Sequence, residues 1–411
     1  MSTNARIYLD YASGTPMAPE AKRAMAVVVQ EEAGNPSSLH EAGRRAKGML
    51  ERARAQVAAL INPSTRPDGL ARDSAPRDVP AGLHAKPEEI YFTSCGTESN
   101  NWALRGLMSA SKRKGAHLVI SAIEHPSVSL VARRLELEGA QVSLLPVDQE
   151  GVVSPSALKA ALRPETVLVS VMLANGEVGT IEPIRELAAL AHEQGALIHT
   201  DAVTAVGRIP VDVNTLGVDA LSLAANQFDG PPGAAALFVR EGVRILPLLE
   251  GGGQETGGRS GTEALLAIAG MGEAAELVMR ELPQRVARLG ALRDRLRDGL
   301  KERVEGLRLN GSWAERLPHN LHICVDGVAS ESLVLGLDEA GVAAGLGSAC
   351  NSKAMRPSHV LKAMGLSDEE AKGALVLTVG VQTTHEEIDR ALEIIPAVIQ
   401  RLRRVTALTA R

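Results

Sequence analysis

Short apolar runs alternate with amphipathic stretches along the middle of the chain. Apolar runs of four to eight residues predict strands, and apolar residues repeated every three or four positions predict helices. The expected strands are 90–93, 117–121, 141–147, 166–173, 196–200 and 219–223, and the expected helices between them are 97–110, 127–138, 154–162 and 184–194. Repeated strand–helix units predict an α/β fold, in which a mostly parallel sheet is covered on both faces.

The two ends of the chain have other patterns. Helices are expected at 19–32, 46–61 and 262–305, the last with a kink near Pro283. Strands at 319–325 and 373–379 and helices at 330–340 and 385–403 predict a smaller α+β domain. We therefore expect a large domain over 16–262 and a small domain built from 1–15 and 263–411.

One segment of the large domain breaks the pattern. Residues 62–86 contain four prolines and two glycines but few large apolar side chains. Such a composition does not bury a core, so a surface loop inserted into the large domain is expected.

Composition and charge limit the classes of function. Of the 411 residues, 45% are hydrophobic and 23% are charged, as in ordinary soluble globular proteins, and this length favours two domains. A formal net charge of -5 without a basic cluster argues against nucleic-acid binding. No apolar run reaches the roughly 18 residues of a membrane span, and the start lacks a signal-peptide pattern. We expect a cytoplasmic protein that binds neither nucleic acid nor membrane.

Candidate chemistry lies where two of the expected strands end. Asp201 follows the strand 196–200, and a Gly/Pro-rich turn follows the strand 219–223. Ligands of α/β proteins bind at this edge of the sheet, where a carboxylate can pair with a cationic ring nitrogen. A lysine in the turn could hold an aldehyde cofactor, but the turn contains Gln227 at the corresponding place.

Several motifs together resemble the cysteine desulfurases, which are pyridoxal phosphate (PLP) enzymes of the class V aminotransferase superfamily. The matching stretches are IYLDYASGT at 7–15, TSCGTESN at 93–100, HTDA at 199–202, GGQETGGRSGT at 252–262 and GLGSAC at 345–350. The resemblance extends from residue 7 to about residue 404. It implies the PLP-transferase fold type I, with a large domain around a mostly parallel sheet and a smaller α+β domain at the C-terminus.

The resemblance also implies a set of cofactor-binding positions. These are Gly96, Thr97, His125, Asn175, Asp201, Gln227 and Thr262. In the family, the threonine that corresponds to Thr262 reaches the phosphate of the neighbouring subunit, which implies a homodimer. Gln227 stands where the family has its Schiff-base lysine, so PLP is the family cofactor but a covalent Schiff base is not expected. Val376 stands where the family has an arginine that binds the substrate carboxylate.

Each of these positions has a simpler interpretation. Residues 93–97 can be a strand-to-helix turn, His125 can be a capping or surface histidine, and the glycines of 252–261 can shape a turn between domains.

The three cysteines differ in their expected roles. Cys350 matches the family cysteine that attacks the substrate sulfur and carries a persulfide, which implies a catalytic role for Cys350 together with His125. A packed cysteine is the alternative for Cys350. We expect Cys324 in the core, and Cys95 as a small buried residue rather than a reactive thiol at a helix start.

The matched motifs, taken together with the departures at Gln227 and Val376, favour a desulfurase-like protein with a degraded PLP site. We expect it to act in sulfur transfer or iron–sulfur cluster assembly through Cys350, with a scaffold or sulfur-acceptor protein as partner and with Cys350 as a possible cluster ligand. A second interpretation is a non-catalytic subunit that stabilises or regulates a paralogous PLP desulfurase. A third is an active desulfurase, or a different enzyme that reuses the pocket.

Overall fold

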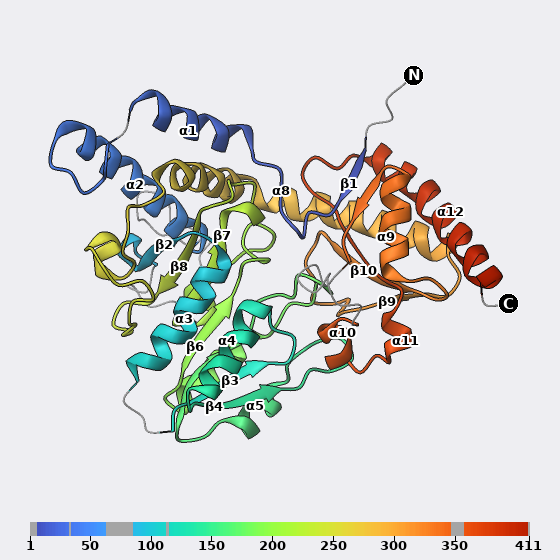
Figure 1. Cartoon of the computed structure of the whole chain (residues 1–411), viewed down its shortest axis with the longest axis horizontal. Coiled ribbons are helices and arrows are strands. Elements are labelled where there is room, and N and C mark those ends of the chain that lie inside the picture. Colours follow the sequence, from blue (N-terminus) through green and yellow to red (C-terminus); the bar gives the residue numbers. More distant parts are fainter. Residues whose placement is uncertain (1–5, 33, 63–84, 112–114, 347–356, 410–411) are drawn as a thin grey trace.

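A computed structural model describes residues 6–32, 34–62, 85–111, 115–346 and 357–409 (Figure 1). Most of the expected insertion, residues 63–84, lies outside the described residues, and so does Cys350. Among the described residues, no helix combines the length and the apolar character that crossing a membrane requires.

The large sheet has seven strands in the order β2-β8-β7-β6-β5-β3-β4. Its strands are β2 (Ile90–Thr93), β3 (His117–Ser121), β4 (Gln141–Leu145), β5 (Thr166–Ser170), β6 (Leu197–Asp201), β7 (Ala220–Ala224) and β8 (Ala235–Val239). The strands from β7 to β4 pair in parallel, whereas β8 is antiparallel to both of its neighbours. The expected α/β fold with a mostly parallel sheet is therefore confirmed.

Helices cover both faces of this sheet, as its nearly all-buried central strands require. The helices of the large domain are α1 (Pro19–Gln30), α2 (Glu41–Leu60), α3 (Gly96–Ala110), α4 (Pro126–Leu137), α5 (Pro155–Ala161), α6 (Ile184–Glu193) and α7 (Val213–Leu216). One core lies between the sheet and helices α3 and α4, with Trp102 as its largest side chain. The core on the other face includes Val57 of α2 and Leu187 of α6. Together the two cores fix the direction in which the strand ends point.

The small domain lies at the other end of the molecule, beside the carboxyl ends of the parallel strands (Figure 1). Its strands are β9 (Leu307–Leu309), β10 (Asn320–Val325) and β12 (Ala374–Thr378), which form an antiparallel sheet, and β1 (Ile7–Leu9), which pairs in parallel with β11 (Val342–Ala344). Its helices are α9 (Ser330–Glu339), α10 (His359–Ala363), α11 (Asp368–Ala371) and α12 (His385–Thr409). The N-terminal strand therefore belongs to the same unit as the C-terminal third of the chain.

Helix α8 (Leu265–Arg303) takes part in both domains. Its first half, with Ile268 and Met271, packs in the core of the large domain, and its second half, with Leu292 and Leu296, packs in the core of the small domain. The division at residue 262 stays a prediction, since the long helix crosses from one core to the other.

Candidate functional site

A cavity of about 430 Å³ lies between the carboxyl end of the sheet and the small domain. The N-terminal arm contributes Asp10, Ala12 and Ser13 to its wall, and β12 contributes Val376. Six of the predicted cofactor-binding residues line it: Gly96, Thr97, His125, Asn175, Asp201 and Gln227. The cavity therefore gathers residues that are more than a hundred positions apart in the sequence.

Asp201 is the last residue of β6, and its carboxylate is buried. Oδ2 accepts a hydrogen bond from Asn100 Nδ2 at 2.6 Å, and Oδ1 accepts one from the Val203 backbone N–H at 3.0 Å. Burial raises the pKa of Asp201, and these donors together with nearby His125 act in the opposite direction. A cationic donor in the cavity would add to this stabilisation of the carboxylate.

Helix α3 begins at the cavity wall. Cys95 is its N-cap residue and is exposed, so the expectation of a buried cysteine was wrong. The strand β2 ends at Thr93, so Cys95 lies beyond the strand, at the start of the helix. A Cβ at Gly96 would lie 2.6 Å from Val203 Cγ2, so only glycine allows this close approach. The first N–H groups of the helix therefore lie open to an anion.

His125 caps helix α4 beside the cavity. Its Nδ1 accepts a hydrogen bond from the Ser127 backbone N–H at 3.1 Å and lies 2.7 Å from Ser127 Oγ. Ser127 Oγ in turn accepts a hydrogen bond from Asn100 Nδ2 at 2.8 Å. Asn100 therefore connects His125 to Asp201, a role that the sequence analysis missed although Asn100 follows Gly96 by about one helical turn.

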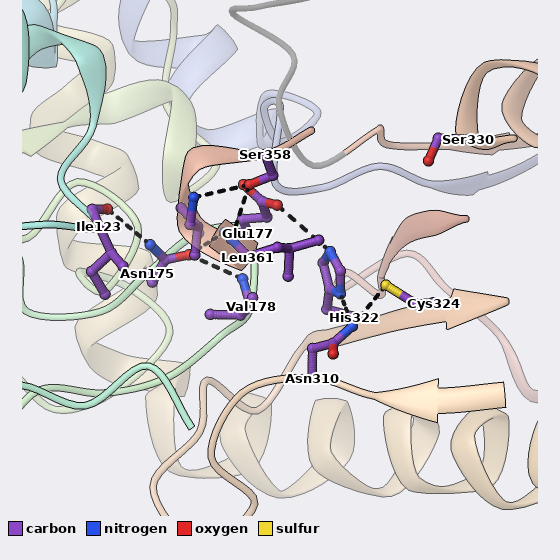
Figure 2. Close-up of polar contacts among 12 residues, drawn as sticks. Ile123, Asn175, Glu177, Val178, Asn310, His322, Cys324, Ser330, Ser358 and Leu361 are labelled. Carbon is purple, nitrogen blue, oxygen red and sulfur yellow. Dashed lines mark hydrogen bonds and ion pairs between the residues drawn. The ribbon is translucent and has the colours of Figure 1, made fainter. Parts of the chain in front are cut away.

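Asn175 holds the neighbouring loop (Figure 2). Its Oδ1 accepts hydrogen bonds from the backbone N–H groups of Glu177 and Val178, and its Nδ2 donates to the Ile123 carbonyl oxygen. The side-chain amide is thus largely used within the protein. Its position at the cavity agrees with the expectation, but a direct contact with a cofactor stays a prediction.

A buried polar chain runs from Glu177 to Cys324 (Figure 2). Glu177 Oε1 lies 3.7 Å from His322 Nε2, and His322 Nδ1 lies 2.9 Å from Asn310 Nδ2. Asn310 Nδ2 also lies 3.1 Å from Cys324 Sγ. Cys324 is 3% exposed, and burial raises the pKa of its thiol to about 11. The expected place of Cys324 in the core is confirmed, and its thiol stays protonated at neutral pH.

Gln227 lies in the short helix η2 (Ala225–Gln227), directly after β7. Its Nε2 donates a hydrogen bond to the Ala12 carbonyl oxygen at 3.0 Å. Arg208 donates to the carbonyl oxygens of Gln227 and Tyr11 from behind the turn. Among the described residues that line the cavity, none is a lysine or an arginine.

Thr262 is exposed and does not line the cavity. The loop before it is held firmly, because Arg259 donates to Glu98 at 2.8 Å and Glu255 forms two 2.7 Å hydrogen bonds with Arg54. A role of Thr262 on a partner subunit stays a prediction. Cys350 lies outside the described residues, and within those residues no group of three or more His, Cys, Asp or Glu side chains could hold a metal ion.

The described residues of the cavity fit the PLP that the motifs imply. Asp201 offers a carboxylate to a ring nitrogen, and the start of α3 at Gly96 and Thr97 offers N–H groups to a phosphate. The Asn100 Oδ1 atom is buried without a hydrogen-bond partner among the described residues, as expected of a site that awaits a ligand. When bound, PLP supplies an electron sink for amino-acid chemistry.

Comparisons with known proteins agree with this geometry. The model of the family "Aminotransferase class-V" matches residues 72–391. The chain is 41% identical to "Cysteine desulfurase IscS" of Methanosarcina thermophila over 99% of this chain and 95% of that protein. It is 43% identical to "Cysteine desulfurase IscS 1" of Archaeoglobus fulgidus over 98% of this chain and all of that protein.

Solved structures show the same fold. A "NIFS-LIKE PROTEIN" superposes with a TM-score of 0.85 at 32% identity, covering 97% of this chain and 100% of that one. A NifS-like protein from Rickettsia africae gives a TM-score of 0.82 at 28% identity, covering 96% and 99%. The family uses PLP. The chain belongs to the cysteine desulfurase family of class V aminotransferases.

Proposed function

We propose that this chain acts in sulfur transfer or iron–sulfur cluster assembly through the Cys350 thiol, without a covalently bound PLP. The observation that carries the proposal is the chemistry of Gln227. In the turn where the family motif has its lysine, this chain has a side-chain amide that is hydrogen-bonded to Ala12.

An amide cannot replace the lysine amine. Its nitrogen lone pair is delocalised into the carbonyl group, so it neither adds to an aldehyde nor shuttles a proton from the α-carbon of an amino acid. Val376 lines the same cavity, where the family motif has an arginine. A valine side chain has no donor for a substrate carboxylate. Both changes weaken the same reaction, the release of sulfur from free cysteine.

Sulfur transfer does not need these groups. An accessible thiolate accepts the outer sulfur of a donor persulfide, and a thiolate also ligates iron in a shared cluster. In the motif match, Cys350 supplies this thiol. The partner on this proposal is a sulfur donor, a sulfur-acceptor protein or a cluster scaffold, and the chain acts as a homodimer in the cytoplasm.

The direct test has two measurements on the purified chain. Borohydride reduction after incubation with PLP should attach no cofactor to any lysine, and incubation with cysteine should release no sulfide. Persulfide transfer from a competent desulfurase should label wild-type protein at Cys350 and should not label that position in Cys350→Ser. A reducible PLP adduct together with steady turnover of cysteine would refute the proposal.

One observation favours a second candidate function. Thr262 is exposed on a loop that Arg259 and Glu255 anchor, and it stays outside the cavity of its own chain. A rigid exposed hydroxyl of this kind suits a non-catalytic subunit that completes the phosphate site of a paralogous desulfurase. The two candidates differ in which residue matters, Cys350 or Thr262.

A further inference from the structure

We propose that Glu177 and His322 form a pH-sensitive latch between the two domains, which ties the small domain to one wall of the cavity when the His322 ring carries a positive charge. The latch consists of these two side chains. Glu177 lies in the segment between β5 and α6 of the large domain, and His322 lies in β10 of the small domain. This inference goes beyond the proposed sulfur-transfer function and does not depend on it.

The latch lies where the small domain contacts the cavity wall. Gly176 and Glu177 line the cavity, and Asn320 of β10 donates through Nδ2 to the carbonyl oxygens of both, each at 3.0 Å. His322 is two residues further along the strand, so its side chain leaves the same face of β10 as that of Asn320. His322 Nε2 lies 3.7 Å from Glu177 Oε1 (Figure 2). The amide bonds from Asn320 do not titrate, so the latch is the part of this junction that responds to pH.

Both members of the latch are buried and incompletely paired. Their side chains are 7% exposed in Glu177 and 0% exposed in His322. Glu177 Oε1 and His322 Nε2 have no hydrogen-bond partner among the described residues, and the 3.7 Å between them is too long for a hydrogen bond. In the part of the chain that the structure describes, His322 is the only basic side chain within 4.0 Å of the Glu177 carboxylate. A positive charge on the ring therefore turns a loose contact into a buried ion pair.

Asn310 can follow a change of charge on the ring. Its Nδ2 lies 2.9 Å from His322 Nδ1 and 3.1 Å from Cys324 Sγ, while its Oδ1 is buried without a hydrogen-bond partner among the described residues. An amide nitrogen only donates, so in this orientation Nδ1 accepts and the ring hydrogen is on Nε2. If the amide turns over, Oδ1 accepts from a protonated Nδ1 and from the Cys324 thiol. The two orientations of the Asn310 amide therefore match the two charge states of the ring.

The other titratable or charged groups on the elements around the ring have partners of their own or carry no charge. Arg308 of β9 donates to Glu370 at 2.9 Å, and His359 of α10 lies 3.0 Å from the Glu124 carbonyl oxygen. The Cys324 thiol is protonated, and the residue of β12 that pairs with His322 is Val376.

Arg316 is the group in this surrounding that opposes a positive charge on the ring. Its guanidinium donates to the carbonyl oxygens of Ser312, Asn310 and Asn320. Glu177 faces the ring directly and favours the charge, so the ion pair forms against a background of one nearby cation.

The direction of the response follows from the ion pair. Histidine is the side chain whose charge ordinarily changes between pH 5 and 8. The latch therefore closes as the pH falls from 8 to 6 and opens as it rises again. The Asn175 side chain holds the backbone N–H groups of Glu177 and Val178 at the same wall, so closing the latch should steady these two amides.

The test is hydrogen exchange on the full-length protein at pH 6 and at pH 8. Peptide mass spectrometry measures the protection of the Glu177 and Val178 amides, after correction for the intrinsic effect of pH on exchange. We expect protection to be about five- to tenfold greater at pH 6, which is the scale of one charged hydrogen bond. His322→Gln and Glu177→Gln each keep a polar side chain but cannot form the ion pair, so both should show equal protection at the two pH values.

The matched control is His192→Gln, which removes a half-exposed histidine of α6 that pairs with Asp219. This variant should keep the pH effect at the cavity wall. Protection that does not change with pH in the wild type, or a pH effect that persists in either latch variant, would overturn the proposal. If one latch variant does not fold, the other gives the same comparison. The measurement involves neither Cys350 nor a cofactor, so its failure leaves the sulfur-transfer function standing, and failure of sulfur transfer leaves the latch standing.

Discussion

The Gln227 side chain binds the backbone of the N-terminal arm, with 3.0 Å between Gln227 Nε2 and the Ala12 carbonyl oxygen. Other contacts strengthen the same junction. Thr15 donates to the Asn226 carbonyl oxygen through both its backbone N–H and its hydroxyl, and Arg208 joins the carbonyl groups of Tyr11 and Gln227. The turn after β7 therefore positions the arm that forms one wall of the cavity, and Gln227 contributes to this link with its side chain.

Substitution Gln227→Lys should not create an active desulfurase. The lysine loses the hydrogen bond to Ala12 at a position that is only 8% exposed, close to the Arg208 guanidinium. We expect a loss of about 1–3 kcal/mol in the free energy of unfolding, from the unpaired carbonyl group and the buried charge. Sulfide release from cysteine should stay at background, because Val376 offers no cation to the substrate carboxylate. Urea denaturation and a sulfide assay measure the two effects.

The matched control for this change is Gln227→Met, which removes the hydrogen bond without adding a charge and keeps a similar length. It should destabilise the chain less than the lysine does. Full desulfurase activity in Gln227→Lys alone would show that the substrate carboxylate is bound by some residue other than the one at position 376.

The three thiols should differ in their rates of alkylation. Cys324 is 3% exposed and its pKa is about 11, so at pH 8 about one molecule in a thousand carries the reactive thiolate. With limiting iodoacetamide on native protein, the peptides that contain Cys95 and Cys350 should be labelled well before the peptide that contains Cys324. All three should react alike in denaturant. Native labelling of Cys324 as fast as Cys95 would show that the small domain opens readily.

Sequence patterns were sufficient to predict the strands of the large sheet and the sheet edge at which the site lies. The apolar runs gave strands such as β5 and β7 within a few residues, and the polar residue at the end of β6 marked Asp201 as cavity-lining. Such patterns depend on contacts near in the chain, so they are visible in a short window.

What the sequence could not supply depends on contacts between distant residues. Cys95 was expected to be buried, because a small cysteine usually is, but the strand ends two residues earlier and leaves it exposed. The link between Gln227 and Ala12 joins residues 215 positions apart, and that between Asn100 and Asp201 joins residues 101 apart. No local pattern carries information about these pairs.

Removal of the buried Glu182 carboxyl should change how stability depends on pH. Burial raises the pKa of Glu182 to about 8 from the usual 4.5, although its Oε2 accepts a hydrogen bond from the Val153 N–H. The folded state thus binds one proton more than the unfolded state between these values, so stability falls as the pH rises from 4.5 to 8. The slope for one such group is at most about 1.4 kcal/mol per pH unit.

Glu182→Gln keeps the shape and removes the titration. The difference in unfolding free energy between variant and wild type should therefore move in favour of the variant as the pH rises from 5 to 8, in urea titrations at several pH values. A difference that does not change with pH would mean that Glu182 is already ionised in the folded protein.

The buried ion pair that anchors the loop before Thr262 should matter for stability. Arg54 and Glu255 have side chains that are 9% and 1% exposed, and Glu255 also accepts the Phe92 N–H. Arg54→Ala leaves a buried carboxylate without its cation, so we expect a loss of about 3–5 kcal/mol in the free energy of unfolding. Arg45→Ala, on the same helix but in an exposed pair with Glu41, should change it by less than about 0.5 kcal/mol. Equal effects of the two substitutions would contradict this assignment.

The choice between a sulfur carrier and a partner subunit can be made with two substitutions in one assay. The chain is mixed with a competent paralogous desulfurase, and both the PLP affinity of the paralogue and the sulfur delivered to a scaffold are measured. Thr262 is exposed, so Thr262→Val should not disturb the core.

If the chain carries sulfur, Cys350→Ser abolishes delivery and leaves the PLP affinity of the paralogue unchanged, whereas Thr262→Val has no effect on delivery. If the chain completes the paralogue's phosphate site, Thr262→Val lowers that affinity by about five- to tenfold, since one hydrogen bond to a charged group is lost, and Cys350→Ser has no effect. Thr262→Ser keeps the hydroxyl and should behave as the wild type in both cases. We expect the first pattern, because the proposed transfer depends on a thiol and not on the exposed hydroxyl.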